Sequence, residues 1–455
     1  MKQIYYTFCC AGKSVVRGAG GDRPRAISKG ISGTEAEQIK KLCFYSISIQ
    51  PFLEKKMSRE AILQNAPVSL KLCNSPVGRV VVHICDALPD QETSREGNYF
   101  AHVLTSLPEK WTAYDVLSLW GSPSWVIKDE NDFPEILPEL EDSSFQKGII
   151  NDQSFVDFLN RDPENIDIFR FLLKAWFSKT PDQKIVFVCE PERSAFALWG
   201  LTRCFPQKYW NSLTFSTYES PSVTISQEVV AFAGTGDYSD QDELVFKTLR
   251  QRQDFRFYWR KDGGSSEEEP RAQYPFWDEL ICRFCEGKLN FFFDFLKTVP
   301  DRYEQSVEWL QFFWIFRFHQ TNLNLKQLRT ACTVPEINKV AATALTQSGR
   351  FSLSEQLTCF DVLRNEERDL LLNRILHEHT IAQLRNMPDF QRLIIQGFET
   401  PAPPEESTKE PAAAESSTAA HKENAAYASA PMEQKSKGCL LALFFLPFLI
   451  FNALR

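Results

Sequence analysis

The sequence predicts an α+β protein: a β-rich N-terminal α+β domain, a small α/β middle domain, a helical C-terminal domain, a disordered linker and a C-terminal apolar helix. Short runs of β-forming residues, separated by Gly and Pro, fill the first third of the 455 residues. A helix, strand, helix, strand order follows, as in small α/β units. Apolar residues at helical spacing then dominate as far as residue 398.

The N-terminal domain is predicted over residues 1–145. Its strand-like runs are QIYYTF, LCFYSISI, VSLKLC and GRVVVHIC. The segment GNYFAHVL is interpreted instead as a helix, because Asn98 is a good N-cap and Tyr99, Phe100, Val103 and Leu104 would form an apolar face. On that helix His102, four residues after Asn98, would share its face.

The middle domain is predicted over residues 146–250. Its helical runs are IDIFRFLLKAWFS and SAFALWGLTRCF, and its strands are KIVFVCE, LTFSTY and EVVAFAG. The strand LTFSTYE alternates, with Thr214, Ser216 and Tyr218 on one side. That polar side is either a binding surface or simply the exposed face of the sheet.

The helical domain is predicted over residues 270–398. Many of the 37 Phe fall there, and EQSVEWLQFFWIFRFHQ is apolar nearly all round a helix. Such a helix is either the core of a bundle or a surface covered by a partner, so self-association through helix 304–320 stays open. We assign Phe312 to the core and leave Trp314 unassigned.

The composition changes abruptly at residue 399. Residues 399–437 are rich in Pro, Ala, Ser, Thr and Glu, which predicts a disordered linker. Residues 438–454 carry no charge and would reach about 25 Å as a helix, at the short end of what spans a membrane. Lys435 and Lys437 favour a cytoplasmic position for the linker side, so the segment is predicted to be a single-pass tail anchor. The alternatives are an apolar helix docked on the globular body and a disordered hydrophobic end.

Charge and cysteine content limit the function classes. The chain has 51 basic and 59 acidic residues, a net charge of −8, so no nucleic acid partner is expected. Its 12 Cys lack the dense spacing of a disulfide framework, which favours reduced thiols. Cys282 and Cys285 form one CxxC without a second pair, and we interpret them as small core or half-buried residues of a helix. No metal and no cofactor are predicted.

Four residues allow an enzymatic hypothesis. His83 and Cys85 lie two apart on GRVVVHIC, so a strand places them on one face, and Asn98 and His102 lie nearby in the sequence. A hydrolase or processing enzyme could use such groups only if a nucleophile and a base converge in a pocket. Buried packing is favoured for His83 and Cys85. For Asn98 a helix N-cap and for His102 a satisfied polar position are favoured, and no catalytic residue is assigned. Asn98 and His102 form the candidate functional cluster.

The order of several motifs resembles a known family. QIYYTFC, AISKGIS, GRVVVHICDALPD and REGNYFAHVLTSL occur as in the N-terminal domain, second type, of bacterial GTPase-associated proteins. Further on, KIVFVCEPERSAFALWGLTRCFPQKYWNSLTFSTYE is similar to the middle domain of the same proteins. The resemblance covers about residues 1–240.

This resemblance implies a non-enzymatic regulatory or adaptor protein that works with a partner GTPase, in a bacterial conflict or defence system. It supplies no catalytic residue. Combined with the predicted anchor at residues 438–454, it places the protein on the cytoplasmic face of the bacterial inner membrane. The two function classes, adaptor and hydrolase, are distinguished by whether Asn98, His102, His83 and Cys85 converge.

Overall fold

The computed structural model describes residues 1–9, 13–16, 21–47, 52, 54–87, 98–127, 134–180, 183–219, 227–232, 255–259, 275–304, 306–347, 349–363, 365–378, 380–388 and 390–391. The chain divides into two compact units, Met1–Trp314 and Ile315–Arg455. The predicted linker 399–437 and anchor 438–454 lie outside the described residues.

The first part of the first unit is built mainly from strands. In chain order it contains β1 (Lys2–Cys9), β2 (Gly21–Ser28), α1 (Gly33–Lys40), η1 (Lys41–Cys43), α3 (Arg59–Asn65), β3 (Ser69–Ser75), β4 (Gly78–Asp86), β5 (Tyr99–Thr105), α4 (Ala113–Leu117), β6 (Ile136–Leu137) and η2 (Asp142–Ser144).

The rest of the first unit alternates helices with short strands. It contains α5 (Asp152–Arg161), α6 (Pro163–Ser178), β7 (Lys184–Val188), α7 (Pro191–Thr202), α8 (Gln207–Trp210), β8 (Phe215–Ser216), β9 (Val229–Phe232), β10 (Phe255–Trp259), α10 (Pro275–Cys285), α11 (Leu289–Leu296), η3 (Asp301–Tyr303) and most of α12 (Val307–Phe318). The described part of the second unit is helical: η4 (Gln320–Asn322), α13 (Leu325–Cys332), α14 (Asn338–Gln347), α15 (Leu353–Leu357), η5 (Phe360–Val362), α16 (Asn365–Glu378) and α17 (Ile381–Arg385).

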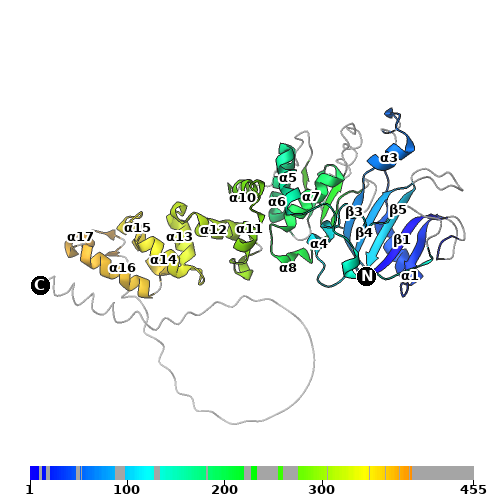
Figure 1. Ribbon diagram of the computed structural model, residues 1–455. Helices are drawn as coiled ribbons and strands as arrows, with labels where there is room; N and C mark the ends of the chain where they lie inside the picture. The colour runs from blue at the N-terminus through cyan, green and yellow to red at the C-terminus, as the bar shows by residue number, and fades with distance from the viewer. Residues whose placement is uncertain are drawn as a thin grey trace, which may run out of the picture. The chain divides into compact units, whose positions relative to one another are not determined.

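The described strands form one ten-stranded mixed sheet in the order β10-β7-β9-β8-β3-β4-β5-β1-β2-β6 (Figure 1). Strands β3, β4, β5, β1 and β2 pair antiparallel, whereas β8, β9, β7 and β10 pair parallel. An antiparallel pair between β3 and β8 joins the two halves. The α+β prediction is confirmed, and the sheet runs on through residue 145. The domain boundaries at residues 145 and 250 stay predictions.

The helix expected over GNYFAHVL is wrong. Residues 99–105 form strand β5, which pairs with β4 on one side and β1 on the other. The helical interpretation rested on local spacing, but two partner strands satisfy the backbone of this segment on both sides. The run LCFYSISI also differs from expectation, because Lys41–Cys43 is a 3-10 turn and residues 44–47 join no strand.

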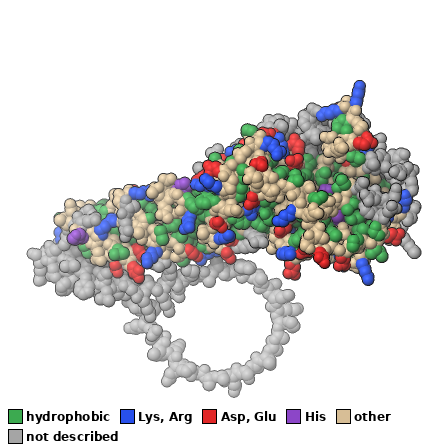
Figure 2. Space-filling model, in the orientation of Figure 1, with side chains coloured by type: hydrophobic (Ala, Val, Ile, Leu, Met, Phe, Trp, Pro, Cys, Tyr) green, Lys and Arg blue, Asp and Glu red, His purple; other side chains and the backbone are tan. Residues whose placement is uncertain are grey.

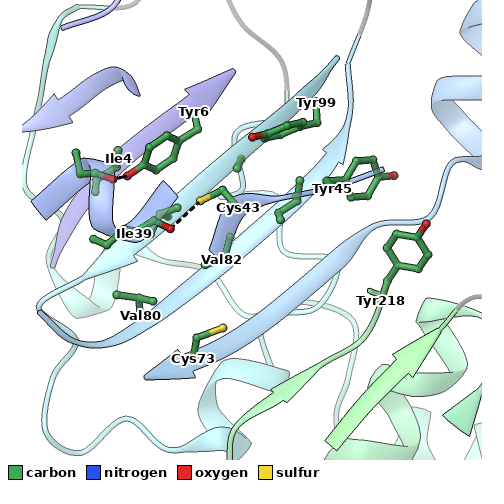
Figure 3. Packing of buried hydrophobic residues seen from close by; sticks show 14 residues of the cluster. Ile4, Tyr6, Ile39, Cys43, Tyr45, Cys73, Val80, Val82, Tyr99 and Tyr218 are labelled. Carbon is green, nitrogen blue, oxygen red and sulfur yellow. Dashed lines mark hydrogen bonds between the residues drawn. The ribbon is translucent and has the colours of Figure 1, made fainter. Parts of the chain in front are cut away.

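One face of the antiparallel strands carries an apolar core (Figure 3). Helix α1 covers this face with Ala36 and Ile39, and it begins in a capping box formed by Ser32 and Glu35. The core residues are Ile4, Tyr6, Ala36, Ile39, Cys43, Tyr45, Cys73, Val80, Val82, Ile84, Tyr99, Ala101, Val103 and Tyr218. Burial of each large side chain contributes about 1.5–3 kcal/mol to the stability of this half.

Close packing of helices characterises the parallel half. Helix α6 packs against β7 and β10, and α7 packs against β9 and α5. Gly200 of α7 allows this approach, because a Cβ there would lie 2.2 Å from Cζ of Phe155 on α5. Glycine at this position is therefore required by sterics.

In the first unit, side chains of helix α12 pack against other residues of the same chain. Phe312, Phe313 and Trp314 are buried, and the Trp314 ring lies 5.2 Å from both Phe276 and Phe295. The burial of Phe312 fits the core interpretation, and Trp314 is buried against rings of α10 and α11. Self-association through helix 304–320 stays a prediction.

Among the residues that the structure describes, no helix is both long enough and apolar enough to cross a membrane. The predicted anchor is not among those residues.

Candidate functional site

The second face of the antiparallel strands is also buried, and a few polar side chains lie there among apolar ones. His83 of β4 lies opposite His102 of β5, and His102 lies opposite Tyr5 of β1. Strand alternation therefore brings the two predicted histidines into one row across three strands. Trp125 and Phe145, from the segment after α4, cover this row.

His102 is held by hydrogen bonds on both ring nitrogens. Its Nδ1 accepts the backbone N–H of Val126 at 3.2 Å, which leaves Nε2 as the donor to Oε1 of Gln3 at 3.0 Å. The ring packs edge-on against Tyr5 and Trp125. Burial, with a smaller effect of His83, lowers the pKa of His102 to about 3. It is thus a neutral residue with a fixed tautomer at physiological pH.

His83 is held by stacking. Its ring lies parallel to Trp125, with 4.7 Å between centroids, and its buried Nδ1 makes no hydrogen bond within the part of the chain that the structure describes. Burial lowers the pKa of His83 to about 3. Both histidines are therefore far from the pKa near 7 that suits a general base.

Cys85 is not positioned as a nucleophile. Its Sγ lies 3.1 Å from the carbonyl oxygen of Ile127 and 3.7 Å from that of Phe100. Burial, and then the neighbouring Asp86, raise the pKa of the Cys85 thiol to about 12. The reactive thiolate is therefore disfavoured.

Asn98 joins the ends of two strands. Its Oδ1 accepts the backbone N–H of Phe8 at 3.1 Å, its neighbour Tyr99 N–H at 2.9 Å, and the hydroxyl of Thr7 at 3.3 Å. Its own carbonyl accepts the N–H of Ala87. Asn98 therefore fixes β1 and β4 at the start of β5, in place of the predicted helix N-cap role.

The four predicted residues do not converge. Asn98 and His102 are four residues apart on an extended segment, which separates them by about 13 Å along the strand, and His83 and Cys85 are about 7 Å apart. A nucleophile and its base must approach to about 3 Å. The described residues also contain no group of three or more His, Cys, Asp or Glu side chains that could hold a metal ion. The hydrolase hypothesis has no geometric support from these four residues.

Sequence reasoning missed the partners that fix the histidines. Gln3 and Trp125 give no signal of their own, because their contacts with His102 and His83 span 99 and 42 residues of sequence. The alternation of QIYYTF does place Gln3 and Tyr5 on one face, which was the available sign of a mixed polar and aromatic layer.

A buried ion pair joins the two halves of the sheet. Nζ of Lys71 on β3 lies 2.8 Å from Oε2 of Glu219, which follows β8, and both side chains are 2% exposed. Lys71 also donates to the carbonyl of Phe44. Burial raises the pKa of Glu219, against the opposing effect of Lys71. Lys71 was visible in the sequence as a lone charge in the apolar run VSLKLC.

The polar side of LTFSTYE is neither a binding surface nor an exposed face. Thr217 donates its backbone N–H to the carbonyl of Leu70 and accepts the Leu70 N–H on its hydroxyl. Ser69 donates to the Tyr218 carbonyl at 2.7 Å. Thr214, Ser216, Thr217, Tyr218 and Glu219 are all buried. This segment is the joint between the two halves.

Several strands begin or end along one border of the sheet. This border is made of strand ends and not of an outer strand, and it is called an edge below. β4 ends and β5 begins there, and the pairing directions place the start of β3 and the end of β8 at the same edge. Helix α3 lies at this edge (Figure 1), where Arg59 contacts Asp86 at 2.8 Å and donates to the Ala87 carbonyl. We call the described residues 54–65 with Asp86 and Ala87 the α3 edge. Loops at a strand edge are common binding surfaces, so the α3 edge is a candidate interaction site.

The α3 edge also carries backbone strain. Lys56 has φ of 53°, a conformation that few non-glycine residues adopt. Lys55 and Lys56 are exposed beside it. Figure 2 shows charges of both signs mixed over the visible face of the described residues.

Comparison with known proteins identifies the N-terminal part. Residues 1–143 match the family model described as GTPase-associated protein 1, N-terminal domain type 2. The resemblance stated for this region is confirmed, and the resemblance of the middle domain stays a prediction. No curated protein matches the chain, and no solved structure matches it.

Proposed function

We propose that this chain is a non-enzymatic regulatory or adaptor protein that binds a partner GTPase. The match of residues 1–143 to a GTPase-associated domain is the observation that carries the proposal. The burial and neutral state of His83 and His102 support the adaptor class over the hydrolase class, because these polar groups serve the scaffold.

The proposal includes a place for the GTPase contact, the α3 edge. Exposed Lys55 and Lys56 flank a helix that is fixed to the sheet by Arg59 and Asp86, so a partner would meet a positioned surface. Charged residues around a contact set partner choice and association rate. The role in a bacterial conflict or defence system is the broader setting of this proposal.

The test is capture followed by reconstitution. Full-length protein is used as bait in native membranes with GDP or a non-hydrolysable GTP analogue, and enriched proteins are assayed for guanine nucleotide binding. We expect a GTPase whose recovery changes at least tenfold between the two nucleotides. Recovery of no guanine nucleotide-binding protein under either condition contradicts the proposal.

The binding surface is then tested with the purified GTPase. Lys55→Glu with Lys56→Glu is expected to weaken binding at least tenfold. The matched control is Lys29→Glu with Lys41→Glu, because both lysines are exposed and lie outside the α3 edge, Lys29 after the end of β2 and Lys41 after the end of α1. Equal weakening by both pairs contradicts the α3 edge as the contact and leaves GTPase binding itself in place.

Membrane tethering by residues 438–454 is the second part of the proposal. The charge-free run behind a polar linker supports it, and it places the body at the cytoplasmic face of the inner membrane, with a single C-terminal span. Deletion of residues 438–455 is expected to move the protein from the membrane pellet to the soluble fraction. A truncated protein that still sediments with membranes after a high-salt wash contradicts the anchor.

A further inference from the structure

The two cysteines of the CxxC in α10 differ from the other described cysteines. Cys282 is exposed and Cys285 is half-buried. The other cysteines whose side chains the structure describes are buried, apart from Cys85, whose thiol contacts two carbonyls. The interpretation of both as core or half-buried residues is therefore correct for Cys285 only. Access for a thiol reagent in water is best at Cys282.

Buried residues of α10 fix the orientation of the helix, and helix geometry then turns Cys282 toward solvent. Trp277, Ile281 and Phe284 are buried, and the Phe284 ring packs between Phe155 and Phe169. A residue one position after Ile281 is turned about 100° away from that buried face. Cys285, three positions beyond Cys282, lies between the buried face of α10 and its exposed side.

Cys285 is the last residue of α10, and a local motif closes the helix behind it. Gly287 has φ of 78°, its N–H donates to the Phe284 carbonyl, and the Lys288 N–H donates to the Arg283 carbonyl. This is the Schellman pattern of helix termination. The Cys285 carbonyl also accepts a hydrogen bond from Nδ2 of Asn160 at 3.0 Å, which ties the end of α10 to α5.

The spacing permits a disulfide after a small local change. Cβ atoms three apart on a helix are about 5–6 Å apart, and a disulfide needs about 3.5–4.5 Å. The last helical turn must therefore tighten by about 1–2 Å. The hydrogen bond from Glu286 N–H to the Cys282 carbonyl spans this turn and is the bond that closure perturbs.

We propose that Cys282 and Cys285 form a dithiol modification site that reacts with low-molecular-weight disulfides. The Cys282 thiolate attacks one sulfur of oxidised glutathione, which forms a mixed disulfide and releases one glutathione thiolate. Burial, and then the neighbouring Cys282, raise the pKa of the Cys285 thiol, so its thiolate is a minor form. That thiolate attacks Sγ of Cys282, which forms the Cys282–Cys285 disulfide and releases the second glutathione. The two protons lost by the cysteines are taken up by the two glutathione thiolates. Two cysteine thiols are oxidised, and one glutathione disulfide is reduced.

The sequence offers a direct readout. Trypsin cleaves after Arg271, Arg283 and Lys288, so the two cysteines fall in separate peptides, AQYPFWDELICR and FCEGK. The disulfide joins these two peptides into one species with a defined mass. The full chain is treated with oxidised glutathione, quenched with acid, alkylated and digested without reduction.

Three proteins are compared. The wild-type chain is expected to give the joined peptides, Cys285→Ser to give a stable glutathione adduct on Cys282, and Cys282→Ser to react at least tenfold more slowly at Cys285. Hydrogen exchange at residues 284–288 is expected to quicken in the oxidised wild-type chain only. Because serine replaces an exposed or half-buried thiol, the melting temperatures of the variants should match that of the wild type.

Two results overturn the proposal. One is a glutathione adduct on wild-type Cys282 that persists as long as in Cys285→Ser, which shows that Cys285 does not resolve it. The other is reaction at Cys282 no faster than at buried Cys332 or Cys359.

Discussion

The two halves of the sheet bury their residues by different means. In the antiparallel half one face is apolar, around Tyr6 and Val82. The other face combines apolar residues such as Phe100 with a polar layer, the buried side chains of His83 and His102 and their neighbour Gln3. In the parallel half, helices α5, α6 and α7 pack rings and a glycine against one another, as at Phe155 and Gly200.

The difference shows what holds the buried side chains in place in each half. Hydrogen bonds to distant residues hold His102 in the polar layer, and stacking on Trp125 holds His83. Shape complementarity fixes the parallel half, where a single added methyl group has no room. Between the two halves, the buried ion pair of Lys71 and Glu219 joins the strands.

Breaking the ion pair between the two halves should lower the free energy of unfolding most. Lys71→Met removes the partner of a buried carboxylate, so the free energy of unfolding is expected to fall by about 3–5 kcal/mol. Urea titration of the full chain measures this change. Lys71→Met with Glu219→Leu should recover most of the loss, because no unpaired charge remains. A double variant as unstable as the single one would mean that packing, not charge pairing, holds the joint.

The polar layer should make stability fall with acid. Burial lowers the pKa of both histidines from 6.5 to about 3, so only the unfolded chain gains their protons between these values. Their contribution is complete above pH 6.5 and falls as the pH drops. At pH 5 the loss relative to pH 7 is about 2 kcal/mol for each histidine.

The matched variant is His83→Phe with His102→Gln. Its free energy of unfolding is expected to change about 4 kcal/mol less than that of the wild type between pH 7 and pH 5. Urea titrations at both pH values give this difference. An identical pH dependence in the two proteins is incompatible with neutral, buried histidines.

The parallel half should respond to added volume. Gly200→Ala places a methyl group against the Phe155 ring and is expected to cost about 1–3 kcal/mol. Adding Phe155→Leu should reduce the cost of the alanine, since the contacting ring is gone. Additive losses in a double-mutant cycle would show that the two sites do not touch.

Helix caps should give smaller and equal effects in both halves. Ser32 begins α1 and Asn151 begins α5, each in a capping box. Replacing either by alanine is expected to cost about 1 kcal/mol. Thermal melts of the two variants check this, and losses that differ by more than about 1 kcal/mol would show that the halves support their helices unequally.

Local signals in the sequence predicted much of this fold. Alternation identified β1, β3 and β4, and apolar spacing identified α6, α7 and α10. The strand β5 was mistaken for a helix, because Asn98 before an apolar run imitates a helix start and its two partner strands lie far away in the sequence. The pairing of β3 with β8 crosses more than 140 residues, so no local pattern contains it.

At the candidate site, too, contacts between residues far apart in the sequence could not be predicted. His83 and Cys85 were correctly placed on one strand, but their partners Trp125 and Ile127 come from a distant segment. Whether a histidine is a base or a structural residue depends on those partners, since they decide its solvation and its pKa. Residue type and spacing alone carry no information about them.

In the function proposed above, the polar layer supports the scaffold and takes no part in the GTPase contact. The most direct measurement is the affinity of the purified GTPase, in its preferred nucleotide state, for the wild-type chain and for His102→Gln, well below the melting temperature of the variant. We predict dissociation constants within threefold of each other, together with reduced stability of the variant. A folded His102→Gln variant that loses more than tenfold in affinity would contradict the account, because His102 would then belong to the functional surface.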